Sequence, residues 1–198
     1  MGKNLENNKK AFAELKKNPD GRSVFSRDGF IEYQQGLNTI VYGKVTASYG
    51  GCGAIAVWNL LKALSIAPDE AVVFDEMENG CILGGLLGTS VLFVKKYLSG
   101  RGHRVNMYCS LKEFKKAFSR IGIVYYMRKN MTAHYVAFTP AGINEKGEYI
   151  YRFHNTSTGA YWKTNDEDGI KYIESIYMTM EDFLKESGAK VKVFYDVR

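Results

Sequence analysis

Hydrophobic and polar positions follow a helical period through the first half of the chain. Residues 5–17 form a polar, amphipathic segment that predicts a surface helix. Residues 52–64 are apolar nearly all round, which indicates a central, buried helix. We expect a further helix that opens at Pro68 and runs over 68–77, and another over 89–98. Between the first two helices, residues 21–51 look irregular, with one short strand near 39–42.

After residue 101 the pattern changes to the period of β-strands. Two further helices are marked by capping boxes, in SLKEFKKAF with Ser110 and Glu113 and in TMEDFLKES with Thr179 and Asp182. Helices come first and strands later, which is the order of an α+β fold with an antiparallel sheet. The predicted strands are RVNMYC, IGIVYYM, HYVAF, EYIYRF, AYW and VKVFYDV.

The length indicates one domain over residues 1–198, since no repeat or linker divides the chain. We divide it into an N-terminal helix and irregular segment (1–45), a helical part (46–100) and a mostly β part (101–198). The first residues lack the apolar core of a secretory signal, and no apolar stretch is long enough to span a bilayer. We therefore expect a cytoplasmic protein without a membrane partner.

Charge and cysteine content narrow the function classes. The formal net charge is +6, but the lysines are scattered as pairs with acidic neighbours, which favours solvated helix faces over a nucleic-acid partner. Three cysteines at irregular spacing argue against a disulfide framework, and the three histidines do not fall at zinc-ligand spacing. We expect no metal and no cofactor.

The stretch SYGGCGAIAVWNLLKAL places Cys52 between glycines at the start of the predicted buried helix. The exposed N–H groups and the dipole of a helix N-terminus lower the pKa of a thiol, and a nearby imidazolium lowers it further. Gly50, Gly51 and Gly53 leave room for a substrate backbone to approach. The sequence therefore predicts an ionised, reactive thiol at Cys52, with a buried structural cysteine as the alternative.

A base and an orienting group follow on two adjacent strands. His134 opens the strand HYVAF, and Asn155 closes the strand EYIYRFHN. Neighbouring antiparallel strands run in opposite directions, so the start of one lies beside the end of the next. An Asn155 amide oxygen there can accept a hydrogen bond from the imidazole and fix the ring. We interpret His103 as a solvated turn residue, His154 as a surface or second-layer residue, and list Cys81 and Cys109 as core thiols.

These segments resemble the papain-like cysteine peptidases, nearest the branch of bacteriocin-processing double-glycine peptidases. GGCGAIAVWNLLKAL is similar to the nucleophile segment, SLKEFKKAFSRIGIVYYMRKNMTAHYVAF to the segment that leads to the histidine, and EYIYRFHN to the strand that ends at the third residue. The likeness covers about residues 45–160. It implies a papain-like fold, with Cys52 as nucleophile, His134 as general base and acid, and Asn155 as the orienting residue.

One part of the family pattern is missing. The family has a glutamine several residues before the cysteine, as an oxyanion donor, whereas this chain has KVTASYGG there. Either Gln34 or Gln35 folds back into the site, or Ser48, Tyr49 or backbone N–H groups take its place. The candidate oxyanion and cleft residues are Gln35, Tyr49, Gly51 and Trp162.

The sequence thus predicts a cysteine-dependent hydrolase, most simply a peptidase that cleaves peptide or isopeptide bonds of a peptide or protein substrate through a thioester. A transglutaminase-like acyltransferase uses the same residues and stays open. A catalytically inactive, papain-like peptide-binding module is the alternative from another class, and a nucleic-acid-binding protein is a distant third. The oligomeric state is left open.

Overall fold

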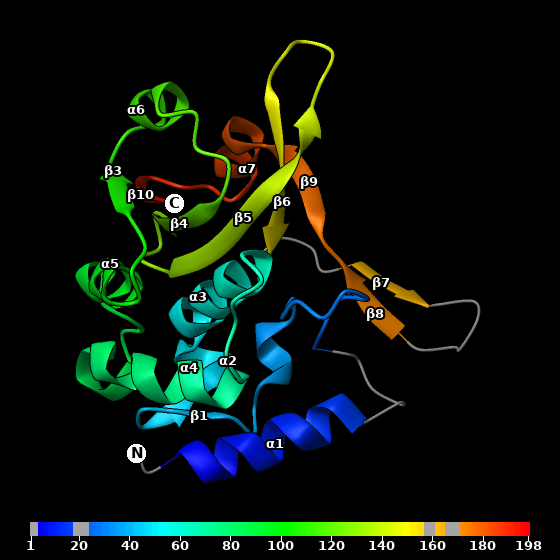
Figure 1. Cartoon of the computed structure of the whole chain (residues 1–198), viewed down its shortest axis with the longest axis vertical. Coiled ribbons are helices and arrows are strands. Elements are labelled where there is room, and N and C mark those ends of the chain that lie inside the picture. The colour runs from blue at the N-terminus through cyan, green and yellow to red at the C-terminus, as the bar shows by residue number, and fades with distance from the viewer. Residues whose placement is uncertain (1–3, 18–23, 157–160, 165–170) are drawn as a thin grey trace.

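The computed structural model describes residues 4–17, 24–156, 161–164 and 171–198 of the chain. Helices form one layer, and an antiparallel sheet lies above it in the view of Figure 1. Two short helices cover the far face of the sheet (Figure 1).

The first helix, α1 (Leu5–Lys17), has the bounds that the sequence predicts. Its buried Phe12 meets Phe74 of α4 (Glu70–Met77) edge to face, with ring centroids 5.4 Å apart. The buried amide of Asn8 bonds to the backbone N–H and C=O of Val41, at 2.9 and 2.8 Å. These contacts hold α1 against the outer side of the helical layer.

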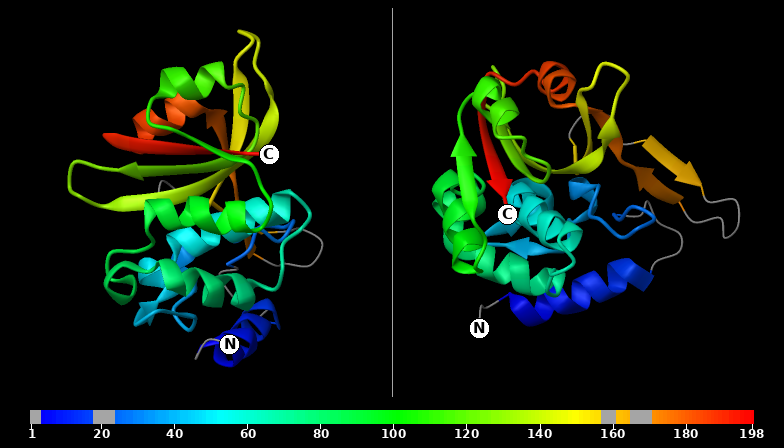
Figure 2. Two further views of the ribbon diagram at one scale, coloured as in Figure 1. Left: turned by 60° about the vertical axis from the view of Figure 1, so that its left-hand side comes forward. Right: turned by 45° about the horizontal axis from the view of Figure 1, so that its top comes forward.

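The central helix, α3 (Cys52–Ala63), is buried from Cys52 through Leu61, as its apolar sequence predicts. It lies between α4 and the sheet, and α5 (Val91–Gly100) packs beside it (Figure 2). Helix α4 begins after Asp69, whose carboxylate accepts a hydrogen bond from the N–H of Ala71. Thus the expected helices are present, each within about two residues of its predicted bounds.

The stretch before α3 contains more regular structure than the sequence suggests. Two-residue strands β1 (Val41–Tyr42) and β2 (Val45–Thr46) pair with each other, and α2 (Ala47–Gly50) leads directly into α3. Short 3-10 helices complete this layer: η1 (Gln34–Gly36), η2 (Glu78–Gly80) and η3 (Ile82–Gly85).

Within the described residues, six strands form the main sheet in the order β3-β10-β4-β5-β6-β9, with antiparallel neighbours. The last strand inserts between two earlier ones, so the end of the chain lies inside the sheet (Figure 2). The strands are β3 (Val105–Tyr108), β4 (Gly122–Met127), β5 (Ala133–Ile143), β6 (Tyr149–His154), β9 (Ile176–Thr179) and β10 (Val191–Val197).

The two faces of the sheet belong to two cores, because successive side chains of a strand point to opposite faces. Tyr135 and Ala137 join the large core around α3, which we call the α3-side core. Val136 and Phe138 join a second cluster, the α7-side core. Its buried members are Phe114, Val124, Tyr126, Val136, Phe138, Tyr151, Phe153, Met180, Phe183, Leu184 and Phe194.

Helices α6 (Leu111–Lys116) and α7 (Met180–Glu186) cover the α7-side core. Both predicted helix starts are confirmed as N-caps: the Ser110 hydroxyl accepts from the N–H of Glu113, and the Thr179 hydroxyl accepts from that of Asp182. Apart from the main sheet, β7 (Tyr161–Thr164) and β8 (Lys171–Glu174) pair as a ribbon at the side of the molecule (Figure 1).

The architecture is therefore α+β with an antiparallel sheet, as the order of elements predicts. Across the described ranges, no helix has both the length and the apolar character needed to cross a membrane.

Candidate functional site

Cys52 is the first residue of α3 and is only 8% exposed. The turn at Gly51 separates α3 from α2, so the thiol stands where a new helix begins. Burial raises the pKa of the Cys52 thiol, and the backbone N–H groups of Tyr135, Gly53 and Cys52 itself, which face the sulfur, oppose this only in part. The structure therefore favours a neutral thiol, contrary to the ionised thiol expected from the sequence.

The glycines around Cys52 serve close packing of the chain rather than substrate access. A Cβ on Gly53 would lie 2.4 Å from the Thr89 hydroxyl, and one on Gly50 would lie 2.4 Å from the Gly85 carbonyl oxygen. The segment 82–89 therefore sits directly against the start of α3. Thr89 also holds this segment to its surroundings, because its hydroxyl meets the Tyr42 hydroxyl at 2.7 Å and its carbonyl accepts from the Tyr135 hydroxyl at 2.9 Å.

His134 is the second residue of β5, and its Nε2 lies 2.7 Å from the backbone oxygen of Asn155. A carbonyl oxygen can only accept, so Nε2 carries the hydrogen and Nδ1 of the neutral ring has a free lone pair. Burial lowers the pKa of His134 to about 4, against the smaller opposing effect of this hydrogen bond. The ring is therefore neutral at physiological pH, and Nδ1 is the atom able to take a proton.

Asn155 orients the ring through its backbone, not through the side-chain amide expected from the sequence. The residue follows β6 directly and adopts the left-handed conformation, with φ of 60°. Its side-chain oxygen accepts from the backbone N–H of Gln34 at 3.0 Å, and its amide nitrogen donates to the Gln34 side-chain oxygen at 3.4 Å. The amide thus binds the segment before α2 and leaves the carbonyl to meet His134.

Of the two upstream glutamines, Gln34 folds back into the site and Gln35 does not. Gln34 is buried, and its Nε2 donates to the carbonyls of Ser48 and Tyr49 at 3.2 and 3.5 Å. The side chain of Gln35 is exposed, so the prediction of Gln35 as an oxyanion donor is not supported by its position. The Gln34 amide is engaged by backbone carbonyls and by Asn155.

These contacts form a continuous path around the three predicted residues. Gln34 joins Asn155 to helix α2, Asn155 joins His134, and the backbone N–H of the residue after His134 faces the Cys52 sulfur. Within the described part of the chain, no hydrogen bond links the Cys52 thiol to the His134 ring. The ring instead packs edge-on to Tyr126, with centroids 6.0 Å apart, so it lies on the α7-side face of the sheet, whereas Cys52 lies on the α3-side face. His134 is therefore not among the residues that line the cleft beside Cys52.

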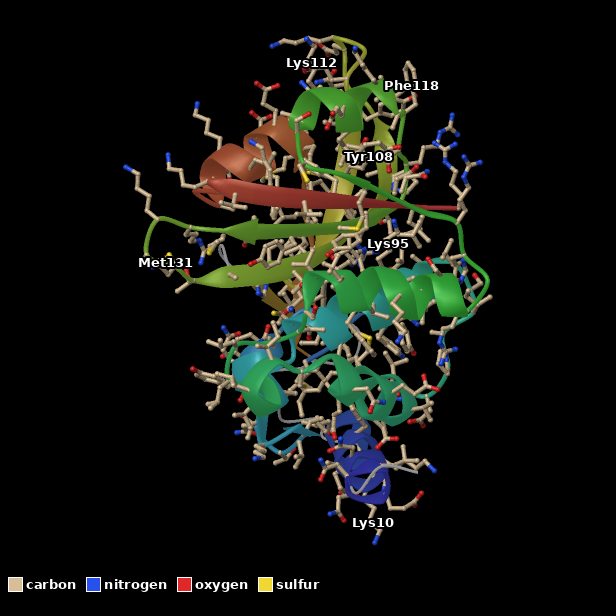
Figure 3. All side chains as sticks on the ribbon, turned by 90° about the vertical axis from the view of Figure 1, so that its left-hand side faces the viewer. Lys10, Lys95, Tyr108, Lys112, Phe118 and Met131 are labelled. Atoms are coloured by element: carbon tan, nitrogen blue, oxygen red, sulfur yellow. The ribbon has the colours of Figure 1, made fainter. Side chains whose placement is uncertain are left out.

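A cleft of about 430 Å³ opens beside the Cys52 thiol. One wall is the segment 82–89, and the other is the hairpin between β4 and β5. Met131 lies at the tip of that hairpin, at the side of the molecule in Figure 3. Many of the lining side chains are apolar and strongly exposed: Tyr49 at 66%, Leu87 at 66%, Met131 at 77%, with Ile82 and Leu86 beside them.

The other predicted cleft residues have different positions. Tyr49 lines the cleft, and Gly51 is buried in the turn before Cys52, where a Cβ would lie 2.6 Å from the Ala47 carbonyl oxygen. Trp162 belongs to β7, and its side chain lies outside the described part of the structure.

Two buried residues lie beside Asn155, one predicted in part and one missed from the sequence. His154 is completely buried, stacked on Phe30 with its Nδ1 2.8 Å from Glu32, so it agrees with the second-layer position and not with the surface position that the sequence left open. Glu32 is itself buried, and its position inside the apolar stretch GFIEY was the available signal. Of the two expected core thiols, Cys109 is exposed and Cys81 is half-buried.

The described residues contain no group of three or more histidine, cysteine or acidic side chains able to hold a metal ion. In comparisons with known proteins, no family model matches the chain, and no curated protein matches it.

Proposed function

We propose that this protein is a cysteine-dependent hydrolase of papain-like type, with Cys52 as the nucleophile and His134 as the base. The observation that carries the proposal is the approach of the start of β5 to the start of α3, where the N–H next to His134 faces the Cys52 sulfur. The neutral imidazole of His134 has a free Nδ1 and is held by the Asn155 carbonyl, beside Tyr126 on the α7-side face of the sheet. A thiol at a helix start, a neighbouring base and a group that orients the base are the parts that such a nucleophile needs.

The reaction starts from two neutral partners rather than from a preformed ion pair. When a substrate carbonyl enters the cleft, Nδ1 of His134 takes the thiol proton while the sulfur forms a bond to the carbonyl carbon. The ring then gives this proton to the leaving amine as the C–N bond breaks, which leaves a thioester on Cys52. Water, deprotonated by the same ring, hydrolyses the thioester. Catalytic hydrogen bonds that are long in an unliganded site shorten in the complex. Here the reaction also requires the His134 ring to turn from Tyr126 towards the cleft at the start of β5, so that Nδ1 can reach Sγ.

Backbone groups are the candidates for holding the oxyanion, since the Gln34 amide is already engaged. The first N–H groups of a helix have no partner within the helix. The N–H of Cys52 is such a group and lies beside the sulfur. An N–H fixed at this place stabilises the charge that develops on a carbonyl oxygen attacked by the thiol.

The cleft supports a peptide substrate with apolar side chains. Its exposed rim of Tyr49, Ile82, Leu86, Leu87 and Met131 is apolar on both walls. A contiguous apolar surface of this kind marks a binding groove more often than ordinary surface. Peptidase activity is therefore the form of hydrolysis that we propose.

The direct test is acylation of the protein by an activated ester. The p-nitrophenyl ester of N-acetyl-leucine has an apolar side chain and a good leaving group. Intact-mass spectrometry should detect one acyl group per chain, on the peptide that contains Cys52, with release of nitrophenol. Cys52→Ala should abolish the adduct, and His134→Ala should slow it by about 10²- to 10⁴-fold. Cys109→Ala is the matched control, because this thiol is exposed and lies outside the cleft.

A peptide-binding module without catalysis is the second candidate, and the raised pKa of the Cys52 thiol favours it. Such a module would bind apolar peptides in the same cleft but would show no acyl adduct at Cys52. Acylation that persists in Cys52→Ala, or that never occurs in the unaltered protein, would rule out the hydrolase.

A further inference from the structure

A buried carboxylate lies behind the Asn155 backbone. Glu32 is 4% exposed and accepts three hydrogen bonds: from the N–H of Asn155 at 2.6 Å, from the Ser175 hydroxyl at 2.6 Å and from Nδ1 of His154 at 2.8 Å. The guanidinium of Arg152 lies 3.8 Å away and balances its charge. Burying a carboxylate is costly unless it is paired and fully hydrogen-bonded, and Glu32 meets both conditions.

Glu32 holds Asn155, the residue whose carbonyl orients the His134 ring. Asn155 adopts a left-handed backbone conformation, which asparagine tolerates better than most residues but which still needs support from its surroundings. Glu32 binds the N–H of Asn155 on one side, and the carbonyl of the same residue reaches His134 on the other at 2.7 Å. The Gln34 N–H holds the side chain of Asn155 at 3.0 Å. The direction of the Asn155 carbonyl is thus set by residues 32 and 34, more than 120 positions earlier in the chain.

We propose that Glu32 is the residue that positions the base, acting through the backbone of Asn155. In this arrangement the Asn155 carbonyl does what a side-chain amide or carboxylate does in the triads that the sequence resembles. Glu32 keeps that carbonyl aimed at Nε2 of His134, and so keeps the Nδ1 lone pair available for the Cys52 proton. The inference rests on the proposed hydrolase function for its consequence in catalysis, whereas its structural part concerns His134 alone.

Two substitutions distinguish a positioning role of Glu32 from a role of the Asn155 side-chain amide. Glu32→Gln keeps the size of the side chain but leaves one acceptor oxygen for three donors, so the N–H of Asn155 loses a charged acceptor. Asn155→Gly removes the amide but keeps the carbonyl, and glycine adopts the left-handed conformation without strain. Ser175→Ala is the matched control, since it removes a different donor to the same carboxylate and leaves Asn155 untouched.

The first readout is the tautomer of His134, measured by ¹⁵N NMR of the ring with His134→Gln to assign the signals. The unaltered protein, Asn155→Gly and Ser175→Ala should all keep the hydrogen on Nε2. Glu32→Gln should give a mixture of both tautomers. Loss of the Nε2–H form in Asn155→Gly, or its full retention in Glu32→Gln, would overturn the inference.

The second readout is acylation by the activated ester. Glu32→Gln should lower kcat about 10- to 100-fold with KM changed less than twofold, because a misplaced base slows chemistry and not binding. Asn155→Gly loses the hold of the Gln34 N–H but keeps the carbonyl and the bond from its backbone N–H to Glu32, so its loss of kcat should be smaller than that of Glu32→Gln, and Ser175→Ala should stay within about fivefold of the unaltered protein. A greater loss in Asn155→Gly than in Glu32→Gln would instead assign the role to the amide. Should the unaltered protein never be acylated, the hydrolase proposal fails, while the tautomer measurement still tests Glu32.

Discussion

The two faces of the main sheet are built in different ways. On the α7 side, aromatic rings pack directly on one another, with Phe114 stacked on Phe194 at 4.6 Å and Phe153 on Phe183 at 4.0 Å. On the α3 side, near Cys52, the elements meet through backbone contacts: a Tyr135 N–H on the sulfur, and Gly53 against Thr89. Side chains also pack near Cys52, where the ring centroids of Tyr125 and Tyr135 lie 4.8 Å apart, but the close backbone contacts set this face apart.

The two faces therefore differ in what they contribute to the protein. Ring packing on the α7 side supplies burial, and a hollow of about 240 Å³ on that side is lined by aromatic, aliphatic and polar residues without a cysteine or a histidine. The α3 side instead has an open apolar cleft beside the buried Cys52 thiol. The buried polar groups near it, such as Asn155 with Gln34 and Glu32, have hydrogen-bond partners. We infer that the ring-packed α7-side core serves stability, while the proposed chemistry lies at the edge of the sheet, with Cys52 and the cleft on the α3 side and His134 beside Tyr126 on the other side.

Loss of a ring from the α7 side should cost the protein the most stability. Phe114 is 1% exposed and contacts Phe138, Tyr151 and Phe194. Phe114→Ala should lower the free energy of unfolding by about 3–5 kcal/mol, measured by urea denaturation, because it leaves a cavity in a packed core.

The acylation rate per folded molecule should not change in this variant, since Phe114 lies on the far face from Cys52. Phe118→Ala is the control, because that ring is 69% exposed at the end of the molecule opposite to α1 (Figure 3) and should change stability by less than about 0.5 kcal/mol. A large loss of Cys52 acylation in folded Phe114→Ala would show that the two faces are not separate in function.

A smaller effect is expected from a methyl group on the α3 side. Gly53→Ala places a Cβ 2.4 Å from the Thr89 hydroxyl and 2.6 Å from the Thr89 Cβ, so the segment 82–89 has to move. We expect a loss of about 1–3 kcal/mol in stability, measured by urea denaturation, together with weaker binding of apolar esters.

Gly100→Ala is the matched control, because no atom lies within 4 Å of a Cβ at that position and alanine favours a helix. Thr89→Gly should partly restore Gly53→Ala by removing the colliding atoms. Equal stability of Gly53→Ala and Gly100→Ala would contradict the close packing that sets this face apart.

The sequence predicts the elements of both faces better than the contacts between them. Periodicity and capping signals place α1, α3, α6 and α7, because these depend on neighbours within a turn or two. The same local signals do not predict that Glu32 and His154 are buried together. Their partners lie more than 120 residues away along the chain, and no local pattern encodes such a contact.

In the candidate site, too, the positions of the residues could be predicted and their contacts could not. Cys52, His134 and Asn155 could be singled out because each stands at the end of a predictable helix or strand. Which atom of Asn155 meets the ring depends on its left-handed backbone, and the neutral state of the thiol depends on burial by the segment 82–89. Both follow from tertiary packing, so the sequence led us to expect the side-chain amide and an ionised thiol instead.

A weak pH dependence should come from His134, whose ring lies beside Tyr126 at the edge of the α7-side core. Burial holds the pKa of His134 at about 4, below the ordinary value of 6.5. Between these values the unfolded chain binds the proton and the folded protein does not, so stability falls as the pH drops from 6.5 towards 4.

Urea denaturation should therefore show that the protein is less stable at pH 4.5 than at pH 7. His134→Gln should reduce this loss of stability. His103→Gln, a matched substitution in the turn before β3, should leave the loss unchanged. The acylation rate should likewise fall on the acid side near pH 4, where the ring gains its proton, and not near 6.5. Asp28 responds to acid in a lower pH range. Hydrogen bonds from Arg152 and Ser26 lower the pKa of its carboxyl group, against the opposing effect of burial. Its contribution to the stability of the fold is therefore lost only below the ordinary pKa of aspartate. An acid limb near 6.5 that His134→Gln leaves in place would mean that another group, and not this buried ring, controls the thiol.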